Sequence, residues 1–228
     1  MWLPTPAEGE GIFGVAIELP APAAALVDPL RCPAQRQAFS PHITLVGPFA
    51  LPENALPLLR RHLADVAAAT APFPVLLSGA ATFLPVSPVA YLRVDDAAAA
   101  RLTSLEAALR TGLLDVPSRF PFVPHVTLAM AHEPDQLERF LAQAASAAVH
   151  FEAREFGLYR LKKGRAAVDG QADGTSAPQP DRPGAHTGRA AGGTSAPHPD
   201  QAAGGAAGTG RPALLPSAQQ MAVFSLHG

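Results

Sequence analysis

Short apolar runs along the chain are separated by segments in which leucines recur every three or four residues. The short runs alternate with polar residues or are rich in β-branched and aromatic residues, and both patterns predict strands. The leucine spacing, as in Leu102, Leu105 and Leu109, predicts amphipathic helices. The expected strands cover residues 11–19, 41–46, 73–84, 89–94, 124–128, 150–161 and 221–226. The expected helices cover residues 21–30, a segment that opens at 51–54, a segment between Asp95 and Gly112, and a segment that opens at 133–135.

The order of these elements is a β-α-β-α-β unit written nearly twice. Asp95 is a favourable N-cap residue and Gly112 favours a helix end, which supports the boundaries of the third helix. Pro33 predicts irregular structure over residues 31–40, and Gly47-Pro48 is expected to end the second strand. The sheets formed by two such halves could face one another.

Residues 164–216 differ in composition from the rest of the chain. They are mostly Gly, Ala, Pro, Ser, Thr and Gln, and they contain the imperfect repeat of residues 174–181 and 193–200. Such a segment buries too little apolar surface to offset the entropy lost on ordering, so we expect it to be disordered. We expect one domain formed by residues 1–163 and 217–228, with residues 164–216 inserted in the hairpin that pairs the last two strands.

Two pentads carry the most specific signal in the sequence: Pro41-His42-Ile43-Thr44-Leu45 and Pro124-His125-Val126-Thr127-Leu128. Alternate side chains of a strand point to the same face, so the histidine and the threonine of each pentad project together. The other apolar side chains then point into the core. One such pentad would be a core strand with a histidine on it, but two, each followed by helical sequence, predict the halves of one site.

The composition favours a globular cytoplasmic protein. The hydrophobic fraction is 48%, and the single cysteine, Cys32, excludes an intramolecular disulfide. The first residues lack the basic and apolar regions of a signal peptide, and no run is long enough to span a membrane. The net charge of −2 gives no basic field for gripping long nucleic acid. A small or terminal substrate is therefore expected rather than a duplex.

Paired His-x-Thr motifs, each on an expected strand within this order of elements, resemble those of the 2H phosphoesterase superfamily. That superfamily includes the 2′-5′ RNA ligase-like proteins and the RNA 2′,3′-cyclic phosphodiesterases. The resemblance covers residues 11–161 and 220–226 and leaves the insertion without a counterpart. It implies an α+β fold with two pseudo-symmetric lobes, in which mainly antiparallel sheets face a central cleft lined by both motifs and helices lie outside.

The chemistry of cyclic phosphodiester hydrolysis suits these residue types. One base must activate water and one acid must protonate the departing oxygen, and histidine has a pKa near pH 7 that allows either role. We therefore expect His42 and His125 to be catalytic and Thr44 and Thr127 to bind phosphate oxygens. Which histidine is the base stays open. No cofactor or metal is required, and a zinc site lacks further Cys, Asp or Glu ligands at suitable spacing.

Other residues are weaker candidates for substrate binding. Arg119, just ahead of the second pentad, could hold phosphate, although a solvated loop arginine is an equal alternative. Phe83 and Phe120 could stack on a base, although phenylalanine more commonly packs in a core. Tyr159 and Lys162, on or just after the strand at 150–161, could reach the cleft or lie on the surface.

Three functions are compatible with this sequence. The leading one is a metal-independent phosphodiesterase that opens a 2′,3′-cyclic phosphate, at RNA 3′ ends or on small cyclic nucleotides, to a 2′-phosphate. The second is ATP-independent 2′-5′ joining of RNA, which would use the same residues. The third is a non-catalytic module that binds RNA ends or nucleotides. No obligate protein partner is indicated, and a monomer is expected.

Overall fold

The helices and strands follow the chain in nearly the predicted order, with one short helix added and one predicted strand divided in two. The computed structural model describes residues 3–115, 120–130, 134–162 and 217–228. The strands are β1 (Glu10–Glu18), β2 (His42–Pro52), β3 (Phe73–Thr82), β4 (Val89–Val94), β5 (His125–Met130), β6 (Ala148–Ala153), β7 (Glu155–Lys162) and β8 (Ser217–Ser225). The α-helices are α1 (Ala21–Val27), α2 (Pro33–Ala38), α3 (Leu56–Ala68), α4 (Asp96–Leu109) and α5 (Pro134–Ala144). Short 3₁₀ segments cover Asp28–Leu30, Glu53–Ala55 and Gly112–Leu114.

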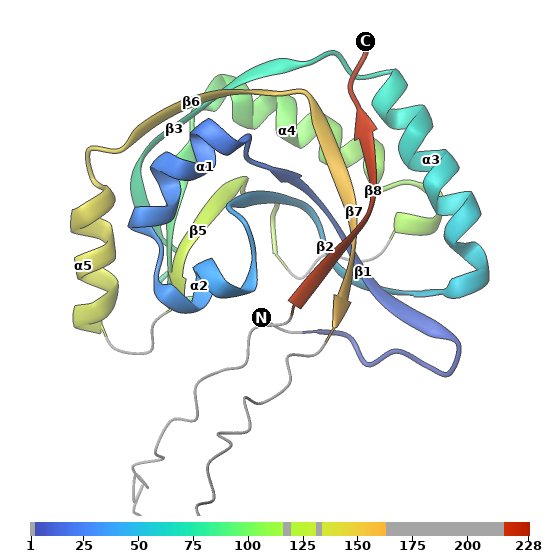
Figure 1. Ribbon diagram of the computed structural model, residues 1–228, viewed down its shortest axis with the longest axis horizontal. Coiled ribbons are helices and arrows are strands. Elements are labelled where there is room, and N and C mark those ends of the chain that lie inside the picture. Colours follow the sequence, from blue (N-terminus) through green and yellow to red (C-terminus); the bar gives the residue numbers. More distant parts are fainter. Residues whose placement is uncertain (1–2, 116–119, 131–133, 163–216) are drawn as a thin grey trace, which may run out of the picture. The chain divides into compact units, whose positions relative to one another are not determined.

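The strands of the described chain form one curled sheet in the order β6-β3-β4-β5-β2-β1-β7-β8 (Figure 1). Each neighbouring pair in it is antiparallel, which confirms the α+β class with mainly antiparallel strands. The two expected sheets are the two halves of this sheet, β2-β1-β7-β8 and β5-β4-β3-β6. A single register pair, Ile43 with Val126, joins the halves. The two pentad strands therefore meet at the centre of the sheet.

Helices pack against both halves of the sheet (Figure 1). Helix α3 contacts β8, and α4 contacts β2 and β3, whereas α5 contacts β3, β4 and β5, and α1 contacts β6. The predicted leucine stripes face the sheet, since Leu59 and Leu63 of α3 and Leu102 and Leu109 of α4 are fully buried. Among the described helices, none is long and apolar enough to cross a membrane.

The pentads alternate between the two faces of the sheet as predicted. Ile43, Leu45, Val126 and Leu128 are buried in the core on the helix-covered face. The histidine and the threonine of each pentad are only partly buried and point to the other face. Burial of the apolar positions fixes the strand register, because a slip by one residue would turn the histidines into the core.

Strand β2 is longer than the sequence predicts. It continues through Gly47-Pro48 to Pro52, so the prediction that this dipeptide ends the strand is wrong. The register between β1 and β2 shifts between Phe13 and Val15, opposite this dipeptide. Proline has no N–H for a regular ladder, and the irregularity removes the need for one.

Two helix boundaries also differ from the prediction. Residues 33–38 form helix α2 instead of irregular structure, because a proline such as Pro33 is favourable in the first turn of a helix. The segment at 51–54 does not open α3, since Leu51 and Pro52 still pair with β1 and a 3₁₀ turn follows. The predicted N-cap of α4 is confirmed, because the Asp95 side chain accepts a hydrogen bond from the Ala98 backbone N–H at 3.2 Å.

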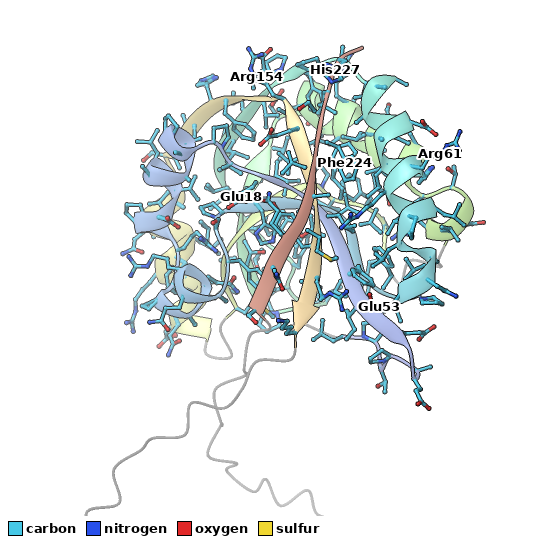
Figure 2. The ribbon with its side chains drawn as sticks, turned by 45° about the vertical axis from the view of Figure 1, so that its right-hand side comes forward. Glu18, Glu53, Arg61, Arg154, Phe224 and His227 are labelled. Carbon is cyan, nitrogen blue, oxygen red and sulfur yellow. The ribbon has the colours of Figure 1, made fainter. Side chains whose placement is uncertain are left out.

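The expected strand at 150–161 is two strands that serve different halves of the sheet. Strand β6 pairs with β3, and β7 pairs with β1 and β8. The predicted pairing of the C-terminal strand is thus confirmed for β7, where Phe224 of β8 (labelled in Figure 2) stacks on Phe156. The two ring centroids are 5.6 Å apart. The predicted disorder of residues 164–216 falls outside the described residues.

Candidate active site

Each pentad histidine is held in the same way by the backbone that precedes it. Nδ1 of His42 donates to the carbonyl oxygen of Ser40, and Nδ1 of His125 donates to that of Val123, both at 2.8 Å. A carbonyl oxygen only accepts, so Nδ1 carries the proton and Nε2 of the neutral ring keeps its lone pair. Both rings can therefore offer Nε2 as a base, or as an acid once protonated.

The central strand pairing brings the four predicted residues to one place. In an antiparallel pair, residues that flank the Ile43–Val126 pair face one another in opposite order. His42 therefore lies across from Thr127, and Thr44 lies across from His125, on the partly exposed face of the sheet. The two histidines are diagonal neighbours, for which a regular sheet gives a separation of roughly 7–8 Å.

Burial lowers the pKa of both histidines below the ordinary value of 6.5. For His42 the hydrogen bond to Ser40 acts against this shift, the charge of Arg31 adds to it, and the carboxylate of Glu18 opposes it. For His125 the hydrogen bond to Val123 opposes the shift, and the charge of His42 lowers the pKa further. The two rings therefore interact, and the free site favours neutral imidazoles.

Two aromatic rings pack against the ring of His125. Phe83, just after β3, stacks on Tyr91 of β4 with ring centroids 4.2 Å apart and meets His125 edge-on at 4.9 Å. Tyr91 also meets His125 edge-on at 5.2 Å. The predicted candidate Phe83 thus lies at the second pentad, with one face of its ring covered by Tyr91. On the other pentad, Phe39 meets His42 edge-on at 5.6 Å.

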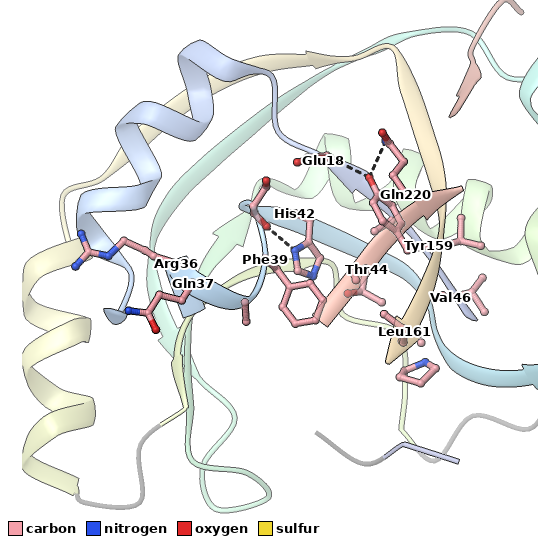
Figure 3. Close-up of a pocket in the computed structure, with 18 residues that line it drawn as sticks. Glu18, Arg36, Gln37, Phe39, His42, Thr44, Val46, Tyr159, Leu161 and Gln220 are labelled. Atoms are coloured by element: carbon pink, nitrogen blue, oxygen red, sulfur yellow. Dashed lines mark hydrogen bonds between the residues drawn. The ribbon is translucent and has the colours of Figure 1, made fainter. Parts of the chain in front are cut away.

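The predicted candidate Tyr159 lies beside the first pentad. Its hydroxyl donates to Oε2 of Glu18 at 3.0 Å and accepts from Nε2 of Gln220 at 3.3 Å. Glu18 in turn stands directly opposite His42 in the β1–β2 register. Burial, followed by the charge of Glu18, raises the pKa of Tyr159, so its hydroxyl stays protonated and acts as a donor. Figure 3 shows these two hydrogen bonds, which join Tyr159 with Glu18 and with Gln220, above Thr44.

A cavity of about 500 Å³ extends from the first pentad (Figure 3). This volume is within the range of small-molecule sites, which is roughly 300–1,000 Å³. The cavity lies over β1, β2, β7 and β8 and is closed on one side by residues 36–40. His42 and Thr44 line it, whereas His125 and Thr127 are not among the described residues that do. The cavity therefore belongs to one half of an otherwise two-sided site.

The remaining candidates lie elsewhere. Lys162 is exposed at the end of β7, where strand alternation directs it away from the face that carries Tyr159. Phe120 is exposed. Arg119 falls outside the described residues. Nε2 of His62 donates to the carbonyl oxygen of Leu109 at 3.0 Å, so this histidine links α3 to the end of α4.

Several residues of the site are missing from the sequence-based prediction. Glu18 and Tyr91 reach it through cross-strand register, Glu18 opposite His42 and Tyr91 opposite Thr127. Local sequence patterns carry no such register, although Glu18 is a charged residue near the end of the apolar run at residues 11–19. Arg31, which is buried, affects the site from the segment that precedes the first pentad.

The donor set of the site differs from that of a metal centre. Among the described residues, no group of three or more His, Cys, Asp or Glu side chains is placed to hold a metal ion. Structural and catalytic zinc sites use at least three such protein ligands. The side chains gathered here are instead two imidazoles, three hydroxyls (Thr44, Thr127 and Tyr159) and one carboxylate.

Comparison with known proteins relates this geometry to one family. The model of the 2′-5′ RNA ligase superfamily matches residues 19–165. A protein named "Putative phosphoesterase" from Geobacillus thermodenitrificans is 33% identical over 131 residues, which cover 56% of this chain and 75% of that protein. A relative described in the same words from Geobacillus kaustophilus is 32% identical over 131 residues, with the same coverage of both chains.

Solved structures share the fold. LigT from E. coli, crystallised with 3′-AMP, has a TM-score of 0.51 and 21% sequence identity, covering 68% of this chain and 91% of LigT. TT0787 from Thermus thermophilus has a TM-score of 0.50 and 23% identity, covering 68% of this chain and 90% of TT0787. The family match spans most of the chain, both pentads included, and the fold agrees with it. The chain therefore belongs to the 2′-5′ RNA ligase superfamily of 2H phosphoesterases.

Proposed function

We propose that this protein is a metal-independent phosphodiesterase that opens 2′,3′-cyclic phosphates, at RNA 3′ ends or on small cyclic nucleotides, and leaves a 2′-phosphate. The observation that carries this proposal is the matched pair of histidines at the centre of the sheet. Each has its Nδ1 proton tied to a backbone carbonyl at 2.8 Å, and each has a threonine two residues later on the same face.

The reaction needs one neutral and one protonated imidazole. The neutral ring accepts a proton from water at Nε2 while the water oxygen forms a bond to phosphorus. The bond from phosphorus to O3′ breaks, and the second ring gives its Nε2 proton to O3′. The product is a 2′-phosphate with a free 3′-hydroxyl. Thr44 and Thr127 donate their hydroxyl protons to the non-bridging oxygens, where negative charge builds up.

The electrostatics of the site disfavour protonation of both histidines at once. A proton on His42 makes protonation of His125 less favourable, so the state with one proton on the pair is preferred over the state with two. That is the state in which one ring can serve as the acid and the other as the base.

Hydrolysis of a nucleoside 2′,3′-cyclic phosphate in the presence of EDTA tests the proposal. We expect turnover by the wild-type protein and its loss in His42→Ala and His125→Ala. His150→Ala is a matched control, because His150 is exposed on β6 and away from the pentads. Lack of turnover by the wild type, or turnover unchanged in both pentad variants, would contradict the proposal.

The family description keeps RNA joining as a second candidate. It would use the same two histidines, so the variants do not separate the two reactions. Incubation of RNA halves that end in a 2′,3′-cyclic phosphate and a 5′-hydroxyl does separate them, because joining yields a longer product with a 2′-5′ linkage. A non-catalytic module would instead bind the cyclic phosphate without changing it, in the wild type and in His→Gln variants alike.

A further inference from the structure

The reactive residues of the site are nearly symmetric, so by themselves they do not fix the orientation of a substrate. Both histidines bind the carbonyl oxygen two residues back at the same distance, and both follow a proline. A cyclic phosphate could be turned by half a revolution and still meet one histidine and one threonine on each side. Asymmetry must therefore come from the neighbours of the four residues.

The cross-strand neighbours of the two histidines carry opposite charges. Glu18 of β1 lies directly opposite His42, and Arg93 of β4 lies directly opposite His125. Directly opposed side chains of an antiparallel pair share a face of the sheet. On β4, Leu92 and Val94 are buried on the helix-covered face, whereas Arg93 is exposed on the face of the histidines.

Arg93 and Glu18 also differ in what they already bind. Glu18 accepts a hydrogen bond from the Tyr159 hydroxyl and lines the cavity of about 500 Å³. Arg93 forms no ion pair or hydrogen bond within the described residues, whereas Arg31, Arg154 and Arg160 each bind a carboxylate. Arg93 is exposed and lies directly opposite His125, so its guanidinium is a planar fork of donors that matches phosphate on the histidine face of the sheet.

We propose that Arg93 is a phosphate anchor of this site and that Glu18 binds the non-phosphate part of the substrate, so that the two charges together fix its orientation. The inference rests on the proposed function and deepens it. A carboxylate repels phosphate oxygens and accepts hydrogen bonds from sugar hydroxyls or from the amino group of a base. The cavity lies on the Glu18 side only, which gives the nucleoside room where the carboxylate is and leaves the phosphate beside Arg93.

Two substrates separate the two roles: a nucleoside 2′,3′-cyclic phosphate and glycerol 1,2-cyclic phosphate, which has the phosphate ring without the nucleoside. Arg93→Gln should raise KM for both by about 10- to 100-fold, the effect of losing a hydrogen bond to a charged group. Arg93→Lys should recover part of the loss, because it restores the charge without the fork. Glu18→Ala should raise KM for the nucleotide and leave KM for the glycerol compound unchanged.

Arg61→Gln is the matched control, since Arg61 is exposed on α3 (Figure 2) and its loss changes the net charge equally. Unchanged KM values in Arg93→Gln, or a rise in KM for the nucleotide alone, would overturn the proposed role of Arg93 as a phosphate anchor. Equal effects of Glu18→Ala on both substrates would overturn the role of Glu18.

Binding of inorganic phosphate, followed by ³¹P line broadening, tests the anchor without turnover. The wild type and Arg61→Gln should broaden the signal, and Arg93→Gln should do so about 10-fold more weakly. If the wild type hydrolyses neither substrate but binds phosphate through Arg93, the proposed function fails and the anchor stands. If Arg93→Gln binds phosphate as the wild type does, the anchor fails whatever the activity.

Discussion

The charge of His42 lowers the pKa of His125, although the strands that carry the two rings share a single register pair. The rings therefore act on one another across the centre of the sheet. A proton on one ring therefore makes a proton on the other less favourable. This coupling separates the first and second protonation steps, and the interval between them is the pH range in which an acid and a base coexist.

The direction of the pKa shifts predicts the pH dependence of catalysis. Burial lowers the pKa of both histidines below 6.5. The base must be neutral and the acid protonated, so both limbs of the kcat/KM profile of the free enzyme should move to lower pH than for exposed imidazoles. Activity should already fall as the pH rises above 6.5, because the acid loses its proton. Initial rates at low substrate between pH 4 and pH 9 measure this profile.

The kcat profile of the same enzyme serves as an internal comparison. The kcat profile reports the pKa values of the enzyme–substrate complex. There the negative phosphate favours the protonated rings and raises their pKa values. The kcat profile should therefore lie at higher pH than the kcat/KM profile. A kcat/KM optimum above pH 7 would contradict the lowered histidine pKa values of the free enzyme. Two coincident profiles would contradict the rise of these pKa values in the complex.

Asparagine at either histidine separates structure from chemistry. The amide of Asn reaches about as far as Nδ1, so His42→Asn and His125→Asn can keep the hydrogen bonds to Ser40 and Val123 but lack Nε2. We expect thermal midpoints close to that of the wild type and a loss in kcat of at least about 100-fold, the usual contribution of a general acid or base. His150→Asn should change neither quantity. Retained activity in both pentad variants would show that Nε2 is not the reactive atom.

Much of the fold is visible in the sequence because local patterns determine it. The apolar positions of the pentads, the leucine stripes of α3 and α4 and the Asp95 cap are all local signals, and each is confirmed. The continuation of β2 through Gly47-Pro48 is not local, because it depends on an irregular register with β1. The division of the last long strand into β6 and β7 likewise depends on pairing with two distant strands.

The residues of the candidate site also divide into those that the local sequence predicts and those that it does not. The histidines and threonines repeat a short motif, so they can be found by inspection, and the structure brings them together. Glu18, Tyr91 and Arg93 belong to other strands and reach the site only through register. Glutamate, tyrosine and arginine are also common at positions that have no role in a functional site. Only the pairing of the strands distinguishes them from ordinary surface or core residues.

Substitutions at Thr44 and Thr127 test the predicted role of the hydroxyls. Thr44→Val and Thr127→Val keep the shape of the side chain and its fit in the strand, and remove the donor. Loss of one preorganised donor of this kind should lower kcat by about 100- to 1,000-fold. Thr→Ser keeps the hydroxyl and should recover most of the activity. Equal activity of the Val and Ser variants would mean that the hydroxyls do not contact the transition state.

Arg31 is predicted to stabilise the segment that precedes the first pentad and contains Ser40, the hydrogen-bond partner of His42. Its side chain is 1% exposed and donates to Asp28 at 2.8 Å and to the carbonyl oxygens of Gln35 and Phe39 at 2.9 and 2.7 Å. Arg31→Met keeps the apolar stem but leaves both carbonyls without this donor. The free energy of unfolding should fall by about 3 kcal/mol, measured by urea denaturation. Arg61→Met on the exposed side of α3 should change it by less than about 0.5 kcal/mol.

The same Arg31→Met substitution should also move the titration of His42. The positive charge of Arg31 lowers the pKa of His42, so its removal should raise that pKa, provided that the ring keeps its place. An NMR titration of the His42 ring would show the transition at higher pH than in the wild type, while Arg61→Met would leave it unchanged. A folded Arg31→Met protein with wild-type stability and an unmoved His42 titration would show that the arginine supports neither the segment nor the site. Loss of stability with an unmoved titration would restrict its role to the segment, because the charge would then not reach the ring.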